Sequence, residues 1–165
     1  MKLVKTLGAT VALMSFVGAA QAQDSGIYGN IGVEGLDFEG TSGNIVGRFG
    51  YDFANSGSDF GKYFAVEGEG AVGVIDDNDD FKIDYRIAGY GRLKAPIGEN
   101  VEVFGRVGYY YIDTDIGSVD DVAFGGGFEY FFNPSKKNSV RLDYTNLNGD
   151  GGSADVYSIT YGRRF

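Results

Sequence analysis

The sequence contains no cysteine, no histidine and no tryptophan among its 165 residues, and only two prolines. Without cysteine, the chain can form no disulfide bond and can offer no thiolate to a metal ion. Without histidine, it can build neither a Ser-His-Asp nucleophile nor a histidine-ligated zinc site. Histidine is also the commonest general acid or base, and no pair of carboxylates is set apart to replace it. We therefore expect no enzyme, no catalytic residue, no cofactor and no specific metal site.

A long apolar run is also missing. A membrane-spanning helix needs about 20 consecutive apolar residues, and the most apolar stretch, Leu7–Val17, is shorter than that. It follows two lysines and precedes Ala20-Gln21-Ala22, which is the order of regions in a cleaved secretory signal peptide. The sequence therefore predicts a signal peptide over residues 1–22 and one mature domain over residues 23–165.

Glycine and aromatic residues are abundant instead, with 28 glycines, 12 tyrosines and 13 phenylalanines. Aromatic residues favour strands, so this composition suits an all-β protein better than a helical one. The formal net charge is −9 and no basic stripe is visible. An acidic chain of this kind is not expected to bind nucleic acid.

Eight segments show the two-residue period of a β-strand, in which apolar and polar side chains alternate. In the last one, Tyr157, Ile159 and Tyr161 alternate with serine, threonine and glycine. Turn-forming residues, such as those of Asn148-Gly-Asp-Gly-Gly152, separate the segments. An even number of strands joined in this way can close into an antiparallel up-and-down barrel without a free edge. The eight segments are residues 26–36, 44–53, 63–74, 81–95, 101–112, 122–132, 139–146 and 155–165.

The charged residues of these segments fall in the phase opposite to the apolar residues. We expect a single charged residue, Arg163, in the apolar phase. So clean an apolar face suits lipid, where a Lys or Arg at the bilayer midplane costs about 2–4 kcal/mol. Tyrosine and phenylalanine gather near segment ends, for example at Tyr109 and Tyr111, as in the aromatic girdles of membrane barrels. The sequence therefore predicts an eight-stranded antiparallel up-and-down transmembrane β-barrel.

Alternation alone does not say which phase points into a barrel. A soluble periplasmic lipocalin-like barrel would bury the apolar phase around a ligand and expose the charged phase to water. Such proteins usually carry a Gly-x-Trp motif, which the absence of tryptophan removes. The girdles and the glycine content favour the membrane barrel, and the soluble binding barrel stays as an alternative.

Short glycine-aromatic motifs carry a family resemblance. They are Tyr28-Gly-Asn-Ile-Gly32, Arg48-Phe-Gly-Tyr51 and Arg106-Val-Gly-Tyr109, and the sequence ends on Phe165. Together with the signal peptide and the eight segments, they make the whole mature chain resemble the small eight-stranded outer-membrane barrels of Gram-negative bacteria. This family includes the transmembrane domain of outer membrane protein A, outer membrane protein X and the opacity-type surface barrels.

The resemblance implies a location and a set of partners. The chain would be a monomer in the cell outer membrane, in contact with lipid and lipopolysaccharide, with its N-terminus on the periplasmic side. Tyr161 and Phe165 would form the signal that the outer-membrane assembly machinery reads. We expect a structural or surface-interaction role in the cell envelope, and a narrow porin-like channel for small solutes is the alternative.

The charged phase is expected to fill the lumen of the barrel. An eight-stranded barrel is only wide enough inside for side chains, so charges there must pair with one another and plug the lumen. We expect Lys94 to pair with Glu102 across the Pro96 turn, and Glu69 to pair with Arg86. The predicted lumen residues are Arg48, Glu67, Glu69, Asp84, Arg86, Arg92, Lys94, Glu102, Arg106, Glu129, Arg141 and Asp143.

Four acidic connections would face outward if the N-terminus lies in the periplasm, and they contain no Lys or Arg. Their carboxylates could contact Ca²⁺ or Mg²⁺ weakly and so bridge to lipopolysaccharide; plain solvation is the alternative. The motif Asp76-Asp-Asn-Asp-Asp80 starts like a calcium loop but lacks the glycine and the final glutamate of an EF-hand. The connections are residues 37–43, 75–80, 113–121 and 147–154, and the acidic residues of interest are Asp76, Asp77, Asp79, Asp80, Asp113 and Asp115.

Overall fold

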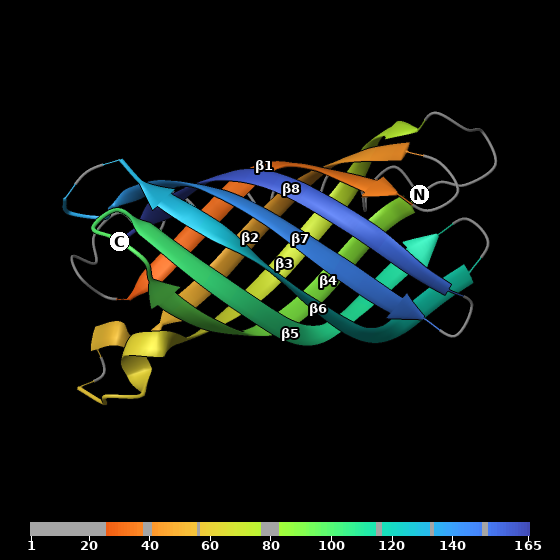
Figure 1. Cartoon of the computed structure of the whole chain (residues 1–165). Helices are drawn as coiled ribbons and strands as arrows, with labels where there is room; N and C mark the ends of the chain where they lie inside the picture. The colour runs from red at the N-terminus through yellow and green to blue at the C-terminus, as the bar shows by residue number, and fades with distance from the viewer. Residues whose placement is uncertain are drawn as a thin grey trace.

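The computed structural model describes residues 26–37, 41–55, 57–76, 83–114, 117–132, 134–149 and 152–165. These residues form eight β-strands (Figure 1), which are β1 (Ile27–Asp37), β2 (Thr41–Asp52), β3 (Phe64–Asp76), β4 (Ile83–Pro96), β5 (Val101–Thr114), β6 (Gly117–Phe131), β7 (Asn138–Gly149) and β8 (Gly152–Arg164). Two short 3-10 helices, η1 (Phe53–Asn55) and η2 (Gly61–Tyr63), connect β2 to β3. No helix within the described ranges is long and apolar enough to cross a bilayer. The predicted signal peptide over residues 1–22 lies outside these ranges.

The eight strands close into a barrel. Each strand pairs antiparallel with the next in sequence and β1 pairs with β8, so the predicted eight-stranded antiparallel barrel is confirmed. Closure leaves no strand edge open to another chain. The start of β1 and the end of β8 meet at one end, where the amide of Phe165 donates to the carbonyl of Ile27 at 2.9 Å. We call this the terminal end, and we call the opposite end, where β1 runs toward β2 and β7 toward β8, the distal end (Figure 1).

The apolar phase of the strands faces outward and the charged phase faces inward. Val33 and Val107 expose 55% and 59% of their surface, whereas Arg92 and Arg141 expose 1% and 0%. A soluble barrel has the reverse order, with its apolar phase inside. The lipocalin-like alternative is therefore wrong, and the outer wall is suited to lipid.

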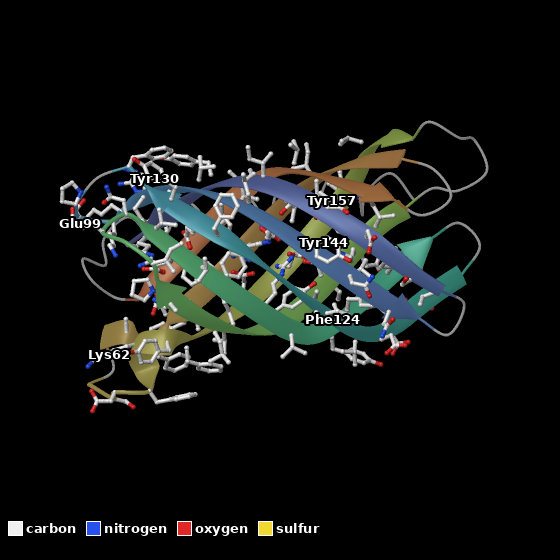
Figure 2. All side chains as sticks on the ribbon, in the orientation of Figure 1. Lys62, Glu99, Phe124, Tyr130, Tyr144 and Tyr157 are labelled. Carbon is white, nitrogen blue, oxygen red and sulfur yellow. The ribbon has the colours of Figure 1, made fainter. Side chains whose placement is uncertain are left out.

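Aromatic rings pair near both ends of the outer wall. Tyr130 lies beside Phe132 at the terminal end, with ring centroids 5.8 Å apart (Figure 2). Tyr144 lies beside Tyr157 in the distal half, with ring centroids 5.3 Å apart (Figure 2). Aromatic side chains at two levels of the wall are the arrangement that the sequence predicts, and Tyr and Phe take the place of tryptophan.

The outer face also carries carboxylates that the sequence analysis did not place there. The hydroxyl of Tyr109 donates to Asp120 at 2.5 Å, and the hydroxyl of Tyr144 donates to Asp155 at 2.8 Å. Both carboxylates lie in the distal half. Asp120 precedes the predicted segment 122–132 because β6 begins at Gly117, whereas Asp155 is the first residue of the predicted segment 155–165 and shares the phase of Tyr157. The expectation that Arg163 is the single charged residue of this face was therefore wrong. A tyrosine hydroxyl beside each carboxylate satisfies part of its hydrogen-bonding capacity at the edge of the apolar band.

Glycines on the inner face make room for large lumen side chains. A Cβ atom at Gly50 would lie 2.4 Å from the ring of Tyr28, and one at Gly162 would lie 2.4 Å from the amide nitrogen of Asn30. Because real atoms do not approach so closely, a larger residue at either position would displace these side chains. The outward-facing Gly70 differs, since nothing lies within 4 Å of its Cβ position.

Candidate functional site in the barrel lumen

The predicted lumen residues point inward because they alternate along each strand with lipid-facing residues. Pairs two positions apart on one strand, such as Glu67 and Glu69 on β3, share the inner face. Asp84 lies on β4, but its side chain is outside the described part of the structure. The remaining predicted residues are all buried, namely Arg48, Glu67, Glu69, Arg86, Arg92, Lys94, Glu102, Arg106, Glu129, Arg141 and Asp143.

The centre of the lumen holds three arginines and three carboxylates from four strands. Arg48 places Nε 2.7 Å from Glu69 Oε2 and Nη1 3.1 Å from Asp143 Oδ2. Arg106 places Nη1 2.8 Å from Glu69 Oε2 and Nη2 2.9 Å from Asp143 Oδ1. Each of these carboxylates therefore faces two guanidinium groups, which offsets the cost of removing its charge from water. The central cluster consists of Arg48, Glu67, Glu69, Arg106, Arg141 and Asp143.

Hydroxyl groups add hydrogen bonds to the central cluster. Glu67 accepts a hydrogen bond from Arg141 Nη1 at 2.6 Å and one from the hydroxyl of Tyr28 at 2.9 Å. Thr145 Oγ1 accepts from Arg106 Nε at 3.1 Å. Sequence reasoning missed these uncharged partners, because a tyrosine or threonine in the inward phase looks like any other strand residue.

Arg86 extends the network toward the distal end. Its Nη2 atom donates to Glu34 Oε2 at 2.8 Å and to Glu69 Oε1 at 2.7 Å, so the predicted pair of Glu69 and Arg86 is present. The expected register is wrong, because Ala88 lies directly opposite Glu69. The two side chains meet diagonally across the β3–β4 pair. Glu34, which the prediction left out of the lumen set, also accepts from Asn44 Nδ2 at 3.1 Å.

Lys94 joins a smaller group near the terminal end. It lies 3.8 Å from Glu102, as expected, but its nearer partner is Asp52 at 2.5 Å. The residue directly opposite Lys94 is Phe104, so the expected register is wrong here as well. Arg164 closes the group, with Nη2 3.1 Å from Glu102 Oε2 and 3.7 Å from Asp52 Oδ2. The prediction omitted Asp52 and Arg164 because both stand at strand ends.

Two arginines stack on one aromatic ring between the terminal group and the central cluster. The guanidinium carbons of Arg92 and Arg141 lie 4.0 Å and 4.2 Å from the centroid of the Phe104 ring. Arg92 also pairs with Glu129 at 2.7 Å, and Glu129 accepts from the hydroxyl of Ser139 at 2.7 Å. Cation–π contacts of this kind strengthen when water is absent. One ring therefore contacts both cationic groups.

Apolar side chains occupy the distal part of the lumen. They belong to the inward phase but carry no charge, and the sequence analysis did not identify them as a group. The hydroxyl of Tyr110 donates to the backbone carbonyl of Asn148, which ties this cluster to the end of β7. We call this cluster the apolar cap, and its buried members are Leu36, Tyr90, Tyr110, Ala123, Leu147 and Val156.

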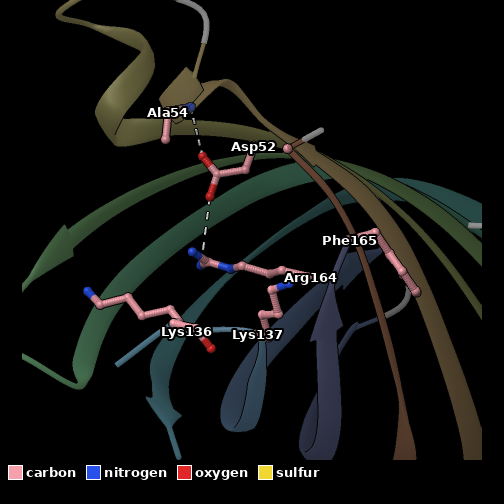
Figure 3. A pocket seen from close by; sticks show the side chains of 8 residues that line it. Asp52, Ala54, Lys136, Lys137, Arg164 and Phe165 are labelled. Carbon is pink, nitrogen blue, oxygen red and sulfur yellow. Dashed lines mark hydrogen bonds and ion pairs between the residues drawn. The ribbon is translucent and has the colours of Figure 1, made fainter. Parts of the chain in front are cut away.

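A shallow cavity of about 150 Å³ marks the terminal mouth of the lumen (Figure 3). The pair of Asp52 and Arg164 lies across it, and Lys136 lines its edge. The side-chain carboxylate of Asp52 also accepts from the amide of Ala54 at 2.9 Å (Figure 3). The cavity therefore opens onto the ion pairs of the terminal group.

The predicted acidic residues are only partly described. Asp77, Asp79, Asp80 and Asp115 lie outside the described ranges. Asp76 ends β3, and Asp113 lies near the end of β5. Among the described residues, no group of three or more Asp, Glu, His or Cys side chains is placed to hold a metal ion. Contact of these connections with divalent cations stays a prediction.

The two residues of the expected assembly signal lie on the last strand and just after it. Tyr161 is exposed on the outer wall, and its hydroxyl donates to Asn138 Oδ1 at 3.0 Å. Phe165 follows β8, and Arg163 lies 5.9 Å from the centroid of its ring. Their recognition by assembly machinery stays a prediction.

The sequence matches the model of one protein family over nearly its whole length. The family is described as the outer membrane protein beta-barrel domain, and the match covers residues 8–165. The chain belongs to this family. The apolar wall is accordingly that of an outer-membrane barrel.

Solved outer-membrane barrels share the fold. Ail, the attachment invasion locus protein of Yersinia pestis, is 15% identical with a TM-score of 0.56, over 84% of this chain and 96% of Ail. The N-terminal β-barrel domain of Pseudomonas aeruginosa OprF is 10% identical with a TM-score of 0.59, over 84% of this chain and 97% of that domain. Neisserial surface protein A is 13% identical with a TM-score of 0.55, over 84% and 96%. Among curated protein sequences, none matches the chain.

Proposed function

We propose that this outer-membrane barrel has a structural or surface-interaction role in the cell envelope and does not conduct solutes. The observation that carries the proposal is the burial of thirteen charged side chains of the described residues inside the barrel, below an apolar cap. The protein would be exported through a cleaved signal peptide over residues 1–22. It would act as a monomer, without a cofactor and without enzymatic activity.

Two unlike barriers support a closed lumen over a porin-like channel. An ion that crosses the central cluster must separate buried charge pairs, and breaking one such pair costs about 3–5 kcal/mol. An ion that crosses the apolar cap must give up its hydration among side chains such as Leu36, Leu147 and Val156. A solute that could pass the charged cluster is poorly suited to pass the apolar cap, and the reverse also holds.

The charge distribution supports an orientation with the terminal end in the periplasm. The exposed cations Lys62, Lys137 and Arg163 lie at the terminal end, whereas the predicted outer connections carry acids and no Lys or Arg. Acidic connections beside the phosphates of lipopolysaccharide require divalent cations as bridges, since Ca²⁺ and Mg²⁺ take carboxylate oxygens. We infer that contact with lipopolysaccharide runs through such bridges.

The structurally similar protein Ail provides a comparison for the surface chemistry of the outer connections. A solved structure of Ail holds sucrose octasulfate, a heparin analogue. A polyanion of that kind needs cationic side chains, and the predicted outer connections of this chain contain none. The proposed surface role therefore does not include binding of sulfated sugars.

Single-cysteine labelling tests the location and the orientation, because the chain has no cysteine of its own. Ser153→Cys would report the distal end and Glu99→Cys the terminal end (Figure 2). A bulky maleimide that cannot cross the outer membrane should label Ser153→Cys on intact cells, and Glu99→Cys only after the membrane is broken. The reverse pattern would overturn the orientation. Recovery of the protein in the soluble periplasmic fraction would overturn the membrane location.

A further inference from the structure

The connection between β2 and β3 projects sideways from the terminal end of the barrel (Figure 1). It carries two large exposed rings, since Phe60 exposes 65% and Tyr63 49% of its surface. Exposed rings this large, gathered on one short connection, mark a surface that is normally covered. We call the group of Phe53, Phe60, Tyr63 and Phe64 the aromatic foot.

The aromatic foot is continuous with the lipid-facing wall. The ring of Tyr51, on the outer face of β2, lies 4.8 Å from the ring of Phe53. Phe53 lies 5.5 Å from Phe64, and Phe64 lies 5.8 Å from Phe60. Phe64 also sits directly opposite Leu93, which is an exposed residue of the outer wall. The apolar surface that meets lipid along β2, β3 and β4 therefore runs without a break onto the foot.

Hydrogen bonds hold the foot in place. The carboxylate of Asp52 accepts from the amide of Ala54 at 2.9 Å while it pairs with Lys94 inside the barrel. The amide of Tyr63 donates to the carbonyl of Phe60 at 3.0 Å. The rings are thus presented by a segment that is tied to the lumen network through Asp52.

A cation stands beside the rings. Lys62 pairs with Asp59 at 2.8 Å, and their side chains are 60% and 99% exposed. An ion pair this exposed is worth little, so the ammonium group can exchange Asp59 for another anion. Aromatic rings beside a lysine are the composition that gathers where acyl chains meet headgroups, because each side chain has an apolar body and a polar end.

We propose that the aromatic foot lies in the headgroup region of the phospholipid leaflet at the terminal end, with its rings against the upper acyl chains and Lys62 beside lipid phosphate. The inference rests on the membrane location proposed above. The foot would fix the depth of the barrel in the bilayer, since moving it into water or into the hydrocarbon core is unfavourable. A second copy of the chain and a periplasmic protein are the other possible occupants of this surface.

Tryptophan fluorescence can test the proposal without background, because the chain has no tryptophan. Phe60→Trp would be refolded into phosphatidylcholine vesicles that carry bromine atoms either near the headgroup or near the methyl end of the acyl chains. Val107→Trp, on the outer wall, is the matched control for the hydrocarbon core. Glu99→Trp, on the β4–β5 turn at the same end of the barrel, is the control for water.

The proposal predicts a distinct pattern for each position. Phe60→Trp should lose about half or more of its emission to bromines near the headgroup, and less to bromines near the methyl end, because interfacial side chains sit about 5–10 Å deep. Iodide in the water should quench Glu99→Trp strongly and Phe60→Trp weakly. Tyr63→Trp should behave like Phe60→Trp. It replaces Phe60→Trp in the experiment if that variant does not refold.

Three results would count against the proposal in different ways. Free access of iodide to Phe60→Trp, with no bromine quenching, would place the foot in water. Protection from both quenchers would mean that protein covers the foot. Either result, with Val107→Trp quenched by bromines near the methyl end, overturns this inference and leaves the membrane location standing. An unquenched Val107→Trp would overturn the membrane location itself.

Discussion

At the scale of single residues, the central cluster tolerates buried charge because its carboxylates are shared between several arginines. Glu69 accepts hydrogen bonds from Arg48 at 2.7 Å, from Arg86 at 2.7 Å and from Arg106 at 2.8 Å. The hydroxyl of Tyr90 adds a longer contact at 3.5 Å. A carboxylate shared by three guanidinium groups is a junction, so its loss affects all three arginines together.

Replacement of Glu69 by glutamine tests this junction. Glu69→Gln keeps the side-chain volume but leaves three arginines without their common counter-charge, so we expect a loss of about 3–5 kcal/mol in the free energy of unfolding. Urea unfolding of the refolded protein in detergent micelles would measure it. Glu99→Gln, at an exposed turn position, is the matched control and should change little. Equal stability of Glu69→Gln and the wild type would contradict the junction role.

The ring of Phe104 gives a second residue-scale prediction. Phe104→Leu keeps an apolar side chain but removes the face on which Arg92 and Arg141 stack. With about 2 kcal/mol for each desolvated cation–π contact, we expect a loss of about 2–4 kcal/mol. Phe128→Leu makes the same change on the outer wall, where no arginine stack is involved, and should cost less. A smaller loss for Phe104→Leu than for Phe128→Leu in the same urea titration would contradict the stacking account.

The sequence predicts which residues share the lumen but not how they pair. Period two assigns a side chain to a face, and eleven residues of the predicted set are buried in the described part of the structure. Period two does not give depth along the barrel axis, so Glu34 and Asp52 were not recognised as partners of Arg86 and Lys94. Partners such as Tyr28 stay hidden because a neutral side chain in the inward phase carries no signal.

At the scale of strands, the number, order and faces of the elements could be predicted, whereas the register could not. The expected pairs of Lys94 with Glu102 and of Glu69 with Arg86 assumed a hairpin alignment that differs from the observed one by two residues. A shift of two residues keeps every side chain on its face, so both ion pairs form diagonally. Register depends on how inward side chains fit beside one another, which a pattern of apolar and polar positions does not encode.

Gly50 provides a test of packing between strands. Gly50→Ala on β2 would place a methyl group against the ring of Tyr28 on β1 and disturb its hydrogen bond to Glu67. Overpacking of this kind typically costs about 1–3 kcal/mol. Gly70→Ala on β3 adds the same methyl group on the lipid-facing side, where nothing lies within 4 Å. If Gly50→Ala and Gly70→Ala unfold at the same urea concentration, the inner face accommodates the added methyl group and the prediction of overpacking is wrong.

At the scale of the whole molecule, the barrel exposes apolar side chains on its outer wall and buries charged side chains in its lumen. The lumen has three layers along the barrel axis. Ion pairs lie at the terminal end and in the centre, and the apolar cap lies at the distal end. The apolar outer wall and the charged lumen could be predicted from the alternation of apolar and charged residues along the strands. The apolar cap could not be predicted from the sequence. Val156 points inward and its neighbour Tyr157 points outward, so two apolar residues in succession interrupt the alternating pattern. Only the closed barrel brings the ends of β1, β7 and β8 together around one apolar cluster.

Single-channel recording tests the central claim, that side chains close the lumen, most directly. The full chain would be refolded, checked for a heat-dependent shift in gel mobility, and inserted into a planar lipid bilayer beside a control membrane that holds a general porin. The account predicts flat current traces for this barrel, since ion pairs and an apolar cap occupy the path in series. Stable, repeated conductance steps from the folded protein would contradict it and would establish the narrow channel instead.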